Sequence, residues 1–286
     1  MTASHPPRSE SGIRLDSTAH LVNGIGIGSR LAGRLRLVSP PVRRPAPPPL
    51  VLVAHGSRDP RAAATVRALQ DRVRALRPGL PVHLGHIELN EPLLPGTLAA
   101  LGDTEAVLVP LLLSRGYHTR QDIPGMAATA RAHTRLAAPL GPHPLLADTL
   151  YDRLAEAGWP ADMDEPTRRA SAVVLAAAGS RDPDSATDTR RTARLLADRL
   201  GVPVVPAYAS AAAPAVPTAV RALAARGRPR VAIASYFTAP GRFATQCAEQ
   251  APWIVSAPMG AHPAMARLIL HRYDQTRATR AEPASA

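Results

Sequence analysis

The 286-residue chain contains no lysine, a single cysteine and few aromatic residues. The shortage of cysteine and that of aromatic residues each argue against particular classes of protein. Because Cys247 stands alone, the chain cannot build a disulfide scaffold, a cysteine-based zinc site or a cysteine-bound iron–sulfur cluster. No apolar run approaches the roughly 20 residues that a membrane-spanning helix needs. We therefore expect a cytoplasmic protein without a membrane partner.

Positive charge comes from arginine alone. The chain has 34 arginines against 22 acidic residues, for a formal net charge of +12, while aromatic residues make up only 3%. Nucleic acid is the first partner that such a charge suggests. However, the folded part has no arginine-rich block and little aromatic material on which bases could stack. We therefore expect no nucleic-acid partner, and a GC-rich genome explains much of the arginine content.

Composition divides the chain into segments. Residues 1–49 are rich in proline and arginine and lack apolar periodicity, which is typical of a disordered extension. We expect a first folded unit over 50–161, a polar linker over 162–169 and a second folded unit over 170–275. A disordered tail is expected over 276–286.

Short apolar runs alternate with helical patterns along the folded part. This alternation predicts the α/β class, with a mostly parallel sheet flanked by helices in each unit. In the first unit we expect strands at 50–54, 81–87, 106–113 and 140–146, and helices at 66–76, 93–101, 126–136 and 149–157.

The two units are copies of each other. The segment Gly56–Pro60 (Gly-Ser-Arg-Asp-Pro) returns as Gly179–Pro183, at an offset of 123 residues. Other landmarks repeat at offsets of 122 and 125, namely Pro92 with Pro214 and Gly102 with Gly227. Such spacing indicates an internal duplication of a unit of about 110 residues rather than a short solenoid repeat.

Three polar residues of the first unit are lost from the second. The corresponding pairs are His55 with Ala178, Glu88 with Ser210, and His118 with Phe243. Duplicated units share what the fold requires, so residues confined to one unit are candidates for chemistry. All three lie at or just after the carboxyl ends of predicted parallel strands, where α/β sheets bind ligands. Two imidazoles and a carboxylate suit a divalent transition metal, and imidazoles also accept protons near neutral pH.

Three motifs, in order, make this sequence resemble the sirohydrochlorin chelatase family. They are Leu52–Arg58 (LVAHGSR), Ile87–Pro92 (IELNEP), and Leu111–His118 (LLLSRGYH) followed by Asp122–Pro124 (DIP). The family comprises class II, ATP-independent tetrapyrrole chelatases of siroheme and cobalamin synthesis, a branch of porphyrin biosynthesis. Its long form has two chelatase-like units, which agrees with the duplication.

The resemblance implies a lyase-type chelatase that inserts Fe²⁺ or Co²⁺ into sirohydrochlorin or a closely related tetrapyrrole. It implies His55 and His118 as metal ligands, with His55 also accepting protons. Glu88 would be the third catalytic residue, binding the substrate or assisting the metal. The metal is then a substrate, and no permanently bound cofactor is expected.

The resemblance also implies a loop that lies against the macrocycle, formed by Leu113, Ser114, Arg115, Gly116, Tyr117 and His118. A tetrapyrrole polycarboxylate suits bidentate pairing with arginine. Arg58 and Arg115 are best placed for this, with Arg181 and Arg242 of the second unit as further candidates. The second unit should be catalytically silent and form the other wall of the cleft. Since one chain supplies both walls, we expect a monomer.

Two other functions fit the same residues. A non-catalytic tetrapyrrole or metal carrier would keep the site and present its metal to a partner enzyme. A metal-dependent hydrolase is disfavoured, because no carboxylate cluster for two metals accompanies the histidine pair.

Overall fold

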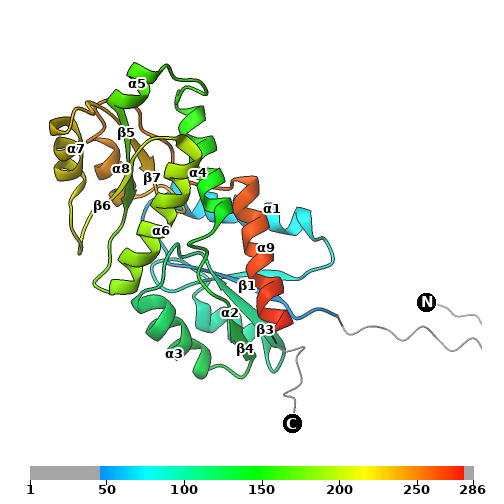
Figure 1. Ribbon diagram of the computed structural model, residues 1–286. Coiled ribbons are helices and arrows are strands. Elements are labelled where there is room, and N and C mark those ends of the chain that lie inside the picture. Colours follow the sequence, from blue (N-terminus) through cyan, green and yellow to red (C-terminus); the bar gives the residue numbers. More distant parts are fainter. Residues whose placement is uncertain (1–45, 280–286) are drawn as a thin grey trace, which may run out of the picture. The chain divides into compact units, whose positions relative to one another are not determined.

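Each half of the chain builds a parallel sheet (Figure 1). The central strand of each sheet is fully buried. The computed structural model describes residues 46–279, so most of the predicted 1–49 extension and the tail from residue 280 lie outside the described residues. The first sheet has the order β2-β1-β3-β4 and the second β6-β5-β7. The strands are β1 (Leu50–Ala54), β2 (Val82–His86), β3 (Glu105–Pro110), β4 (His133–Leu136), β5 (Ser171–Ala177), β6 (Val204–Tyr208) and β7 (Arg230–Ser235).

Helices follow the strands in both halves, as the alternating pattern predicts. In the first half they are α1 (Pro60–Leu76), α2 (Leu94–Leu101), the short π-helix η1 (His118–Asp122), α3 (Ile123–Ala128) and α4 (Pro144–Glu156). In the second half they are α5 (Glu165–Ala170), α6 (Pro183–Leu200), α7 (Val216–Ala225), α8 (Arg242–Ala248) and α9 (Pro263–Ala278). The predicted α/β class with two duplicated, mostly parallel units is therefore confirmed.

The repeated Gly-Ser-Arg-Asp-Pro segment is a strand-to-helix turn in both halves. Asp59 accepts a hydrogen bond from the backbone N–H of Arg61 at 2.9 Å, and Asp182 accepts the equivalent bond from Asp184. Each aspartate thus caps the N-terminus of its helix, and the following proline fits the first helical position, where its missing N–H costs nothing. These structural requirements explain why the aspartate and the proline recur in both halves.

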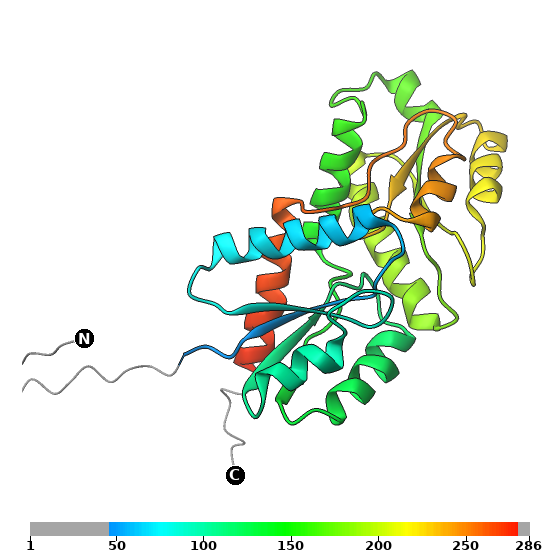
Figure 2. The same ribbon diagram turned by 180° about the vertical axis from the view of Figure 1, so that it is seen from behind.

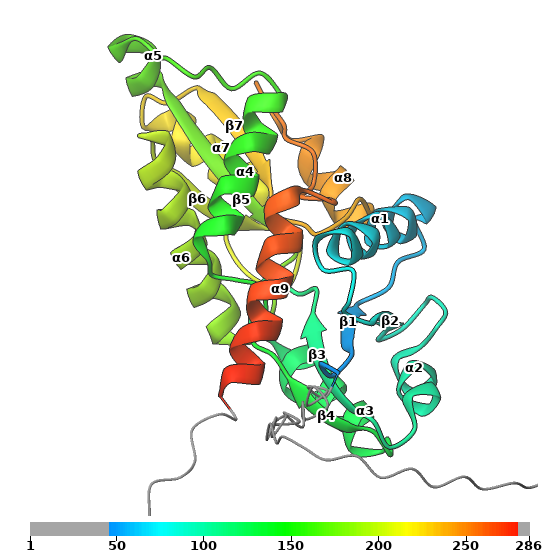
Figure 3. The same ribbon diagram turned by 90° about the vertical axis from the view of Figure 1, so that its right-hand side faces the viewer.

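The last helix of each half packs on the other half. Helix α4 contacts α6 and β7 of the second half, whereas α9 contacts α1 and β3 of the first. Figure 2 and Figure 3 show α9, in orange to red, crossing α1. Because of this exchange, one apolar cluster includes residues of both central strands, such as Leu52 of β1 and Leu175 of β5. The two repeats therefore share a core.

Two expected elements of the first half are replaced by others. The helix expected at 126–136 ends at Ala128, and residues 133–136 form the edge strand β4, paired with β3. The strand expected at 140–146 is a loop followed by α4, which begins at Pro144 because His143 accepts a hydrogen bond from the N–H of Leu145. Proline at the first helical position signals this start.

The expected segment boundaries also differ from the elements by a few residues. Residues 46–49 precede β1 and are attached to the fold, since Tyr273 of α9 donates a hydrogen bond to the Pro48 carbonyl at 2.6 Å. The expected linker at 162–169 contains most of α5, and α9 continues beyond residue 275 to Ala278. None of the helices within residues 46–279 is long and apolar enough to cross a membrane.

The exchange of helices predicts a strong effect at Tyr273, whose side chain is fully buried. Replacing Tyr273 with Ala should lower the free energy of unfolding by about 3–5 kcal/mol, because a large cavity forms where α9 meets the first half. Urea denaturation measures the change. Arg267→Ala, at an exposed position on the same helix, should change it by less than about 0.5 kcal/mol. Equal effects of the two substitutions would contradict this account of the core.

Candidate active site

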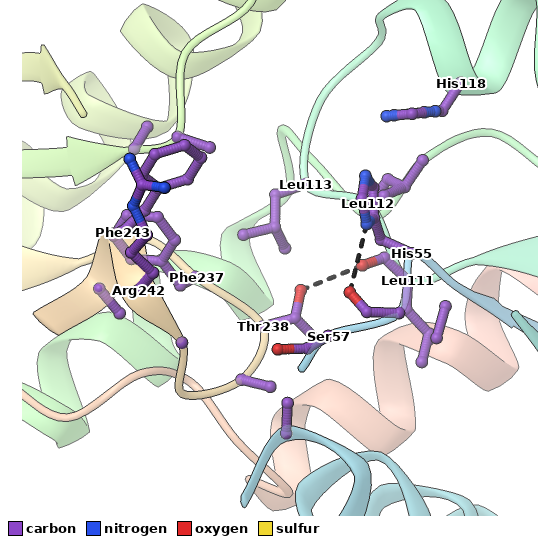
Figure 4. Close-up of a pocket in the computed structure, with 18 of the residues that line it drawn as sticks. His55, Ser57, Leu111, Leu112, Leu113, His118, Phe237, Thr238, Arg242 and Phe243 are labelled. Carbon is purple, nitrogen blue, oxygen red and sulfur yellow. Dashed lines mark hydrogen bonds between the residues drawn. The ribbon is translucent and has the colours of Figure 1, made fainter. Parts of the chain in front are cut away.

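The carboxyl ends of both sheets border a large cleft of about 1350 Å³. Every site residue predicted in the first half lines it: His55, Arg58, Glu88, Leu113, Ser114, Arg115, Gly116, Tyr117 and His118. The second half contributes the facing wall, with Phe237, Arg242 and Phe243 opposite the two histidines (Figure 4). The prediction that the two halves form opposite walls is therefore consistent with the lining of the cleft.

Backbone contacts bring His55 and Glu88 together. His55 follows β1 and Glu88 follows β2, and the N–H of Glu88 donates to the His55 carbonyl at 3.0 Å. Gly56 makes this approach possible: it has a φ of +106°, and a Cβ on it would lie 1.9 Å from the Glu88 carbonyl oxygen. Gly179 has the same contact with Ser210 in the second half. The approach is thus a property of the repeated fold, and only the side chains differ.

The two imidazoles meet edge to face. The ring centroids of His55 and His118 lie 4.6 Å apart, with an angle of 87° between the ring planes. His55 comes from the end of β1, and His118 begins η1 after the loop that follows β3. Both side chains are partly exposed to the cleft, 42% for His55 and 37% for His118. Two nitrogen ligands from different strands are therefore available to one small ion.

Each imidazole has a carboxylate beside its Nδ1 atom. Nδ1 of His118 lies 2.6 Å from Oδ2 of Asp122, one turn further along, and Nδ1 of His55 lies 3.6 Å from Oε1 of Glu88. The 2.6 Å contact with Asp122 fixes the ring orientation of His118. The nearest partner of Nδ1 in His55 is instead the Gly56 carbonyl oxygen, 3.2 Å away. In both rings Nε2 is left as the nitrogen for a metal. Glu88 therefore lies behind His55 rather than as a third ligand beside both rings, and no group of three metal-binding side chains forms within the described residues.

Asp122 is a functional candidate that the comparison of the two halves had not identified. In the second half, Cys247 takes the place of Asp122 at an offset of 125 residues. Phe243 replaces His118 at the same offset. The pair therefore disappears together, which is the pattern expected of residues kept for chemistry. Burial raises the pKa of the Cys247 thiol to about 11, so Cys247 is an inert part of the second half's core.

The arginines of the cleft fall into two groups. Arg115 is held by Asp188, whose Oδ1 and Oδ2 accept bonds of 2.7 and 2.9 Å, and its Nη1 reaches Asp184 at 3.2 Å. Within the described residues, Arg58 and Arg242 have no carboxylate partner and line the cleft. Arg181, the equivalent of Arg58, is exposed but does not line it. Arg115 is therefore already paired with carboxylates of the protein, which disfavours its expected role in binding substrate carboxylates.

Comparison with known proteins identifies the class and then the family. The fold is that of solved chelatases: SirB from Bacillus subtilis with Fe³⁺ is 24% identical, with a TM-score of 0.67, over 82% of this chain and 97% of that one. The profile of the CbiX family matches residues 49–157 and again 172–276. The chain therefore belongs to the CbiX family, and the resemblance to sirohydrochlorin chelatases is confirmed.

Curated relatives match parts of the chain. A sirohydrochlorin cobaltochelatase of Methanococcus maripaludis is 37% identical over 78 residues, which are 26% of this chain and 54% of that protein. The sirohydrochlorin cobaltochelatase of Methanopyrus kandleri is 30% identical over 136 residues, covering 38% of this chain and 95% of that protein. The chain thus spans about half the length of the first of these relatives and nearly all of the second.

The contact between Asp122 and His118 leads to a prediction about the affinity of the protein for Co²⁺. Asp122→Asn should weaken Co²⁺ binding about 10- to 100-fold, because the His118 ring loses the carboxylate that orients it. Calorimetric titration of the purified protein with Co²⁺ measures the affinity. Asp103→Asn, which breaks an exposed ion pair with Arg131, is the control and should bind Co²⁺ as the wild type does. Unchanged affinity in Asp122→Asn would remove Asp122 from the site.

Proposed function

We propose that this protein inserts Fe²⁺ or Co²⁺ into sirohydrochlorin or a closely related tetrapyrrole, for siroheme or cobalamin synthesis. The observation that carries the proposal is the edge-to-face pair of His55 and His118, present in one half only and open to a cleft of about 1350 Å³. A two-imidazole site leaves coordination positions free, so the metal can pass to the ring nitrogens of a macrocycle. Membership of the CbiX family and the named activities of its relatives support the same reaction.

The two histidines differ in ways that suit different tasks. Insertion of M²⁺ displaces two pyrrole N–H protons, which must leave the ring. His118 is bonded to Asp122 at 2.6 Å, so it is a fixed ligand for the incoming metal. Nδ1 of His55 lies 3.2 Å from the Gly56 carbonyl oxygen and 3.6 Å from Oε1 of Glu88, whose side chain is 53% exposed. The His55–Glu88 pair can therefore take up protons from the substrate and release them to solvent.

The substrate's carboxylates need cations that the protein has not already paired. Arg58 beside the histidines and Arg242 on the facing wall meet this requirement, because both line the cleft and neither has a carboxylate partner within residues 46–279. The guanidinium fork of arginine binds a carboxylate through two parallel hydrogen bonds. We assign the macrocycle's acidic groups to these two arginines, one from each half.

The division of labour between the halves is part of the proposal. The catalytic half, 50–161, holds the imidazoles and their carboxylates, and the silent half, 170–275, supplies the opposite wall. Phe237 and Phe243 of that wall offer apolar contact to a flat ring (Figure 4). We propose that the protein acts as a monomer without a permanently bound cofactor, because both walls of the cleft come from one chain.

The proposed ligand role is tested at His118. His118→Ala should reduce the rate of Co²⁺ insertion at least about 100-fold, because the metal loses one of two imidazoles. The rate is followed from the absorbance of sirohydrochlorin after addition of each metal. His133→Ala, on the exposed edge strand β4, is the matched control and should insert metal at the wild-type rate. If the wild type binds Co²⁺ tightly yet never inserts it, the protein is a carrier instead.

The carboxylate assignment predicts a change in substrate affinity rather than in chemistry. Arg58→Ala should raise KM for sirohydrochlorin about tenfold or more, as loss of one charge-assisted pair predicts, while kcat stays near the wild-type value. Steady-state kinetics at constant ionic strength provide the comparison. Arg181→Ala, the equivalent position outside the cleft, should leave both constants unchanged. A fall in kcat alone for Arg58→Ala would contradict the assignment.

A further inference from the structure

The loop that carries His118 is held by the half of the chain that has no catalytic residues. Tyr236 donates a hydrogen bond to the Leu113 carbonyl at 2.8 Å. Thr238 donates one to the Leu111 carbonyl at 3.0 Å (Figure 4). The hydroxyl groups of Ser114 and Ser185 lie 2.9 Å apart. The path of the chain from β3 to η1 is therefore set by side chains of the second half.

The strongest of these contacts is made by Asp188 of α6. Its carboxylate is only 1% exposed, and it accepts both the backbone N–H of Arg115, at 3.0 Å, and the guanidinium of the same residue. Burial pushes the pKa of Asp188 upward, but the hydrogen bonds from Arg115 and the positive charges of Arg115 and Arg191 together hold that pKa below its ordinary value. The carboxylate is thus ionised and committed to one residue of the loop.

A second ionic contact lies further along the same loop. Arg120, which is part of η1, pairs with Asp184 and also with Asp182 at 3.3 Å. Asp184 accepts from Arg115 as well. The first turns of α6 therefore contact the loop on both sides of His118, three residues before it and two residues after it.

Short-range bonds carry this restraint to the imidazole. The Thr119 hydroxyl donates to the Gly116 carbonyl at 2.9 Å and accepts from the Gly116 N–H, and the N–H of Arg120 donates to the same carbonyl. The backbone between Arg115 and Arg120 is therefore a closed turn, and its position follows that of its two arginines. A small misplacement of a catalytic group lowers the rate substantially, so this position matters to the reaction.

We propose that Asp188 is a positioning residue, which fixes His118 opposite His55 through its ion pair with Arg115. The inference rests on the proposed metal-ligand role of His118 and adds a task for the second half, which supports the working loop in addition to forming a wall. The inference also changes the role of Arg115. Its charge is neutralised by Asp188, so it holds the loop in place and does not bind the substrate's carboxylates.

The experiment compares Asp188→Asn with Asp274→Asn in the full-length protein. Asp274 makes a bidentate pair with Arg77, at 2.7 and 2.8 Å, and also joins the two halves, but it lies on α9 outside the cleft lining. Asp188→Asn should weaken Co²⁺ binding about tenfold or more and lower kcat to a similar extent, with KM for sirohydrochlorin unchanged. Asp274→Asn should leave Co²⁺ affinity and kcat within about twofold of the wild type. Thermal melting of both variants shows that each is folded at the assay temperature.

Further variants decide between positioning, stability and substrate binding. Arg115→Gln should repeat the effect of Asp188→Asn, and the double variant should be no worse than either single one, because both act through one pair. If Asp188→Asn does not fold, the partly exposed Asp184→Asn should show a smaller loss of Co²⁺ affinity in the same direction. The proposal is overturned if Arg115→Gln raises KM alone, or if a folded Asp188→Asn keeps wild-type Co²⁺ affinity. Binding of Co²⁺ without insertion by the wild type would instead count against the proposed function.

Discussion

The exchange of α4 and α9 between the two halves is the constraint on which the cleft depends. Each helix buries its apolar face against the sheet, or the helices, of the other repeat, so the two repeats share a core that contains Leu52 and Leu175. Neither half has its full set of covering helices without the other. Because the two sheets are coupled in this way, their carboxyl edges border one cavity. The edge of each sheet forms one wall of that cavity.

Duplication explains which residues are structural and which are free to change. Gly56 and Gly179 have to remain glycine in both halves, because the carbonyl after the second strand lies where a Cβ would be. His118 and Asp122 are under no such demand, and the second half has Phe243 and Cys247 in their places. Cys247 is buried in the second half's apolar core.

The sequence was sufficient to predict the α/β class, the duplication and the position of His55, Glu88 and His118 at one cleft, because the ends of apolar strand runs are local signals. The edge strand β4 was missed because its residues are partly exposed and its strand conformation depends on pairing with β3. The role of Arg115 could not be predicted either. Its partner Asp188 is 73 residues away along the chain, and only the packing of α6 beside the loop brings the two together.

The same pairing shows why net charge is a poor guide to what the cleft binds. The acids of α6 neutralise Arg115 and Arg120, which the sequence places next to His118 and which would otherwise be the nearest cations to the site. Arg58 and Arg242 also line the cleft and are without carboxylate partners in the described residues. The polycarboxylate substrate that we propose would therefore meet its unpaired cations at Arg58 and Arg242 rather than on the loop that carries His118. In the proposed reaction, the centre of the macrocycle would then face His55 and His118 without competition from a carboxylate.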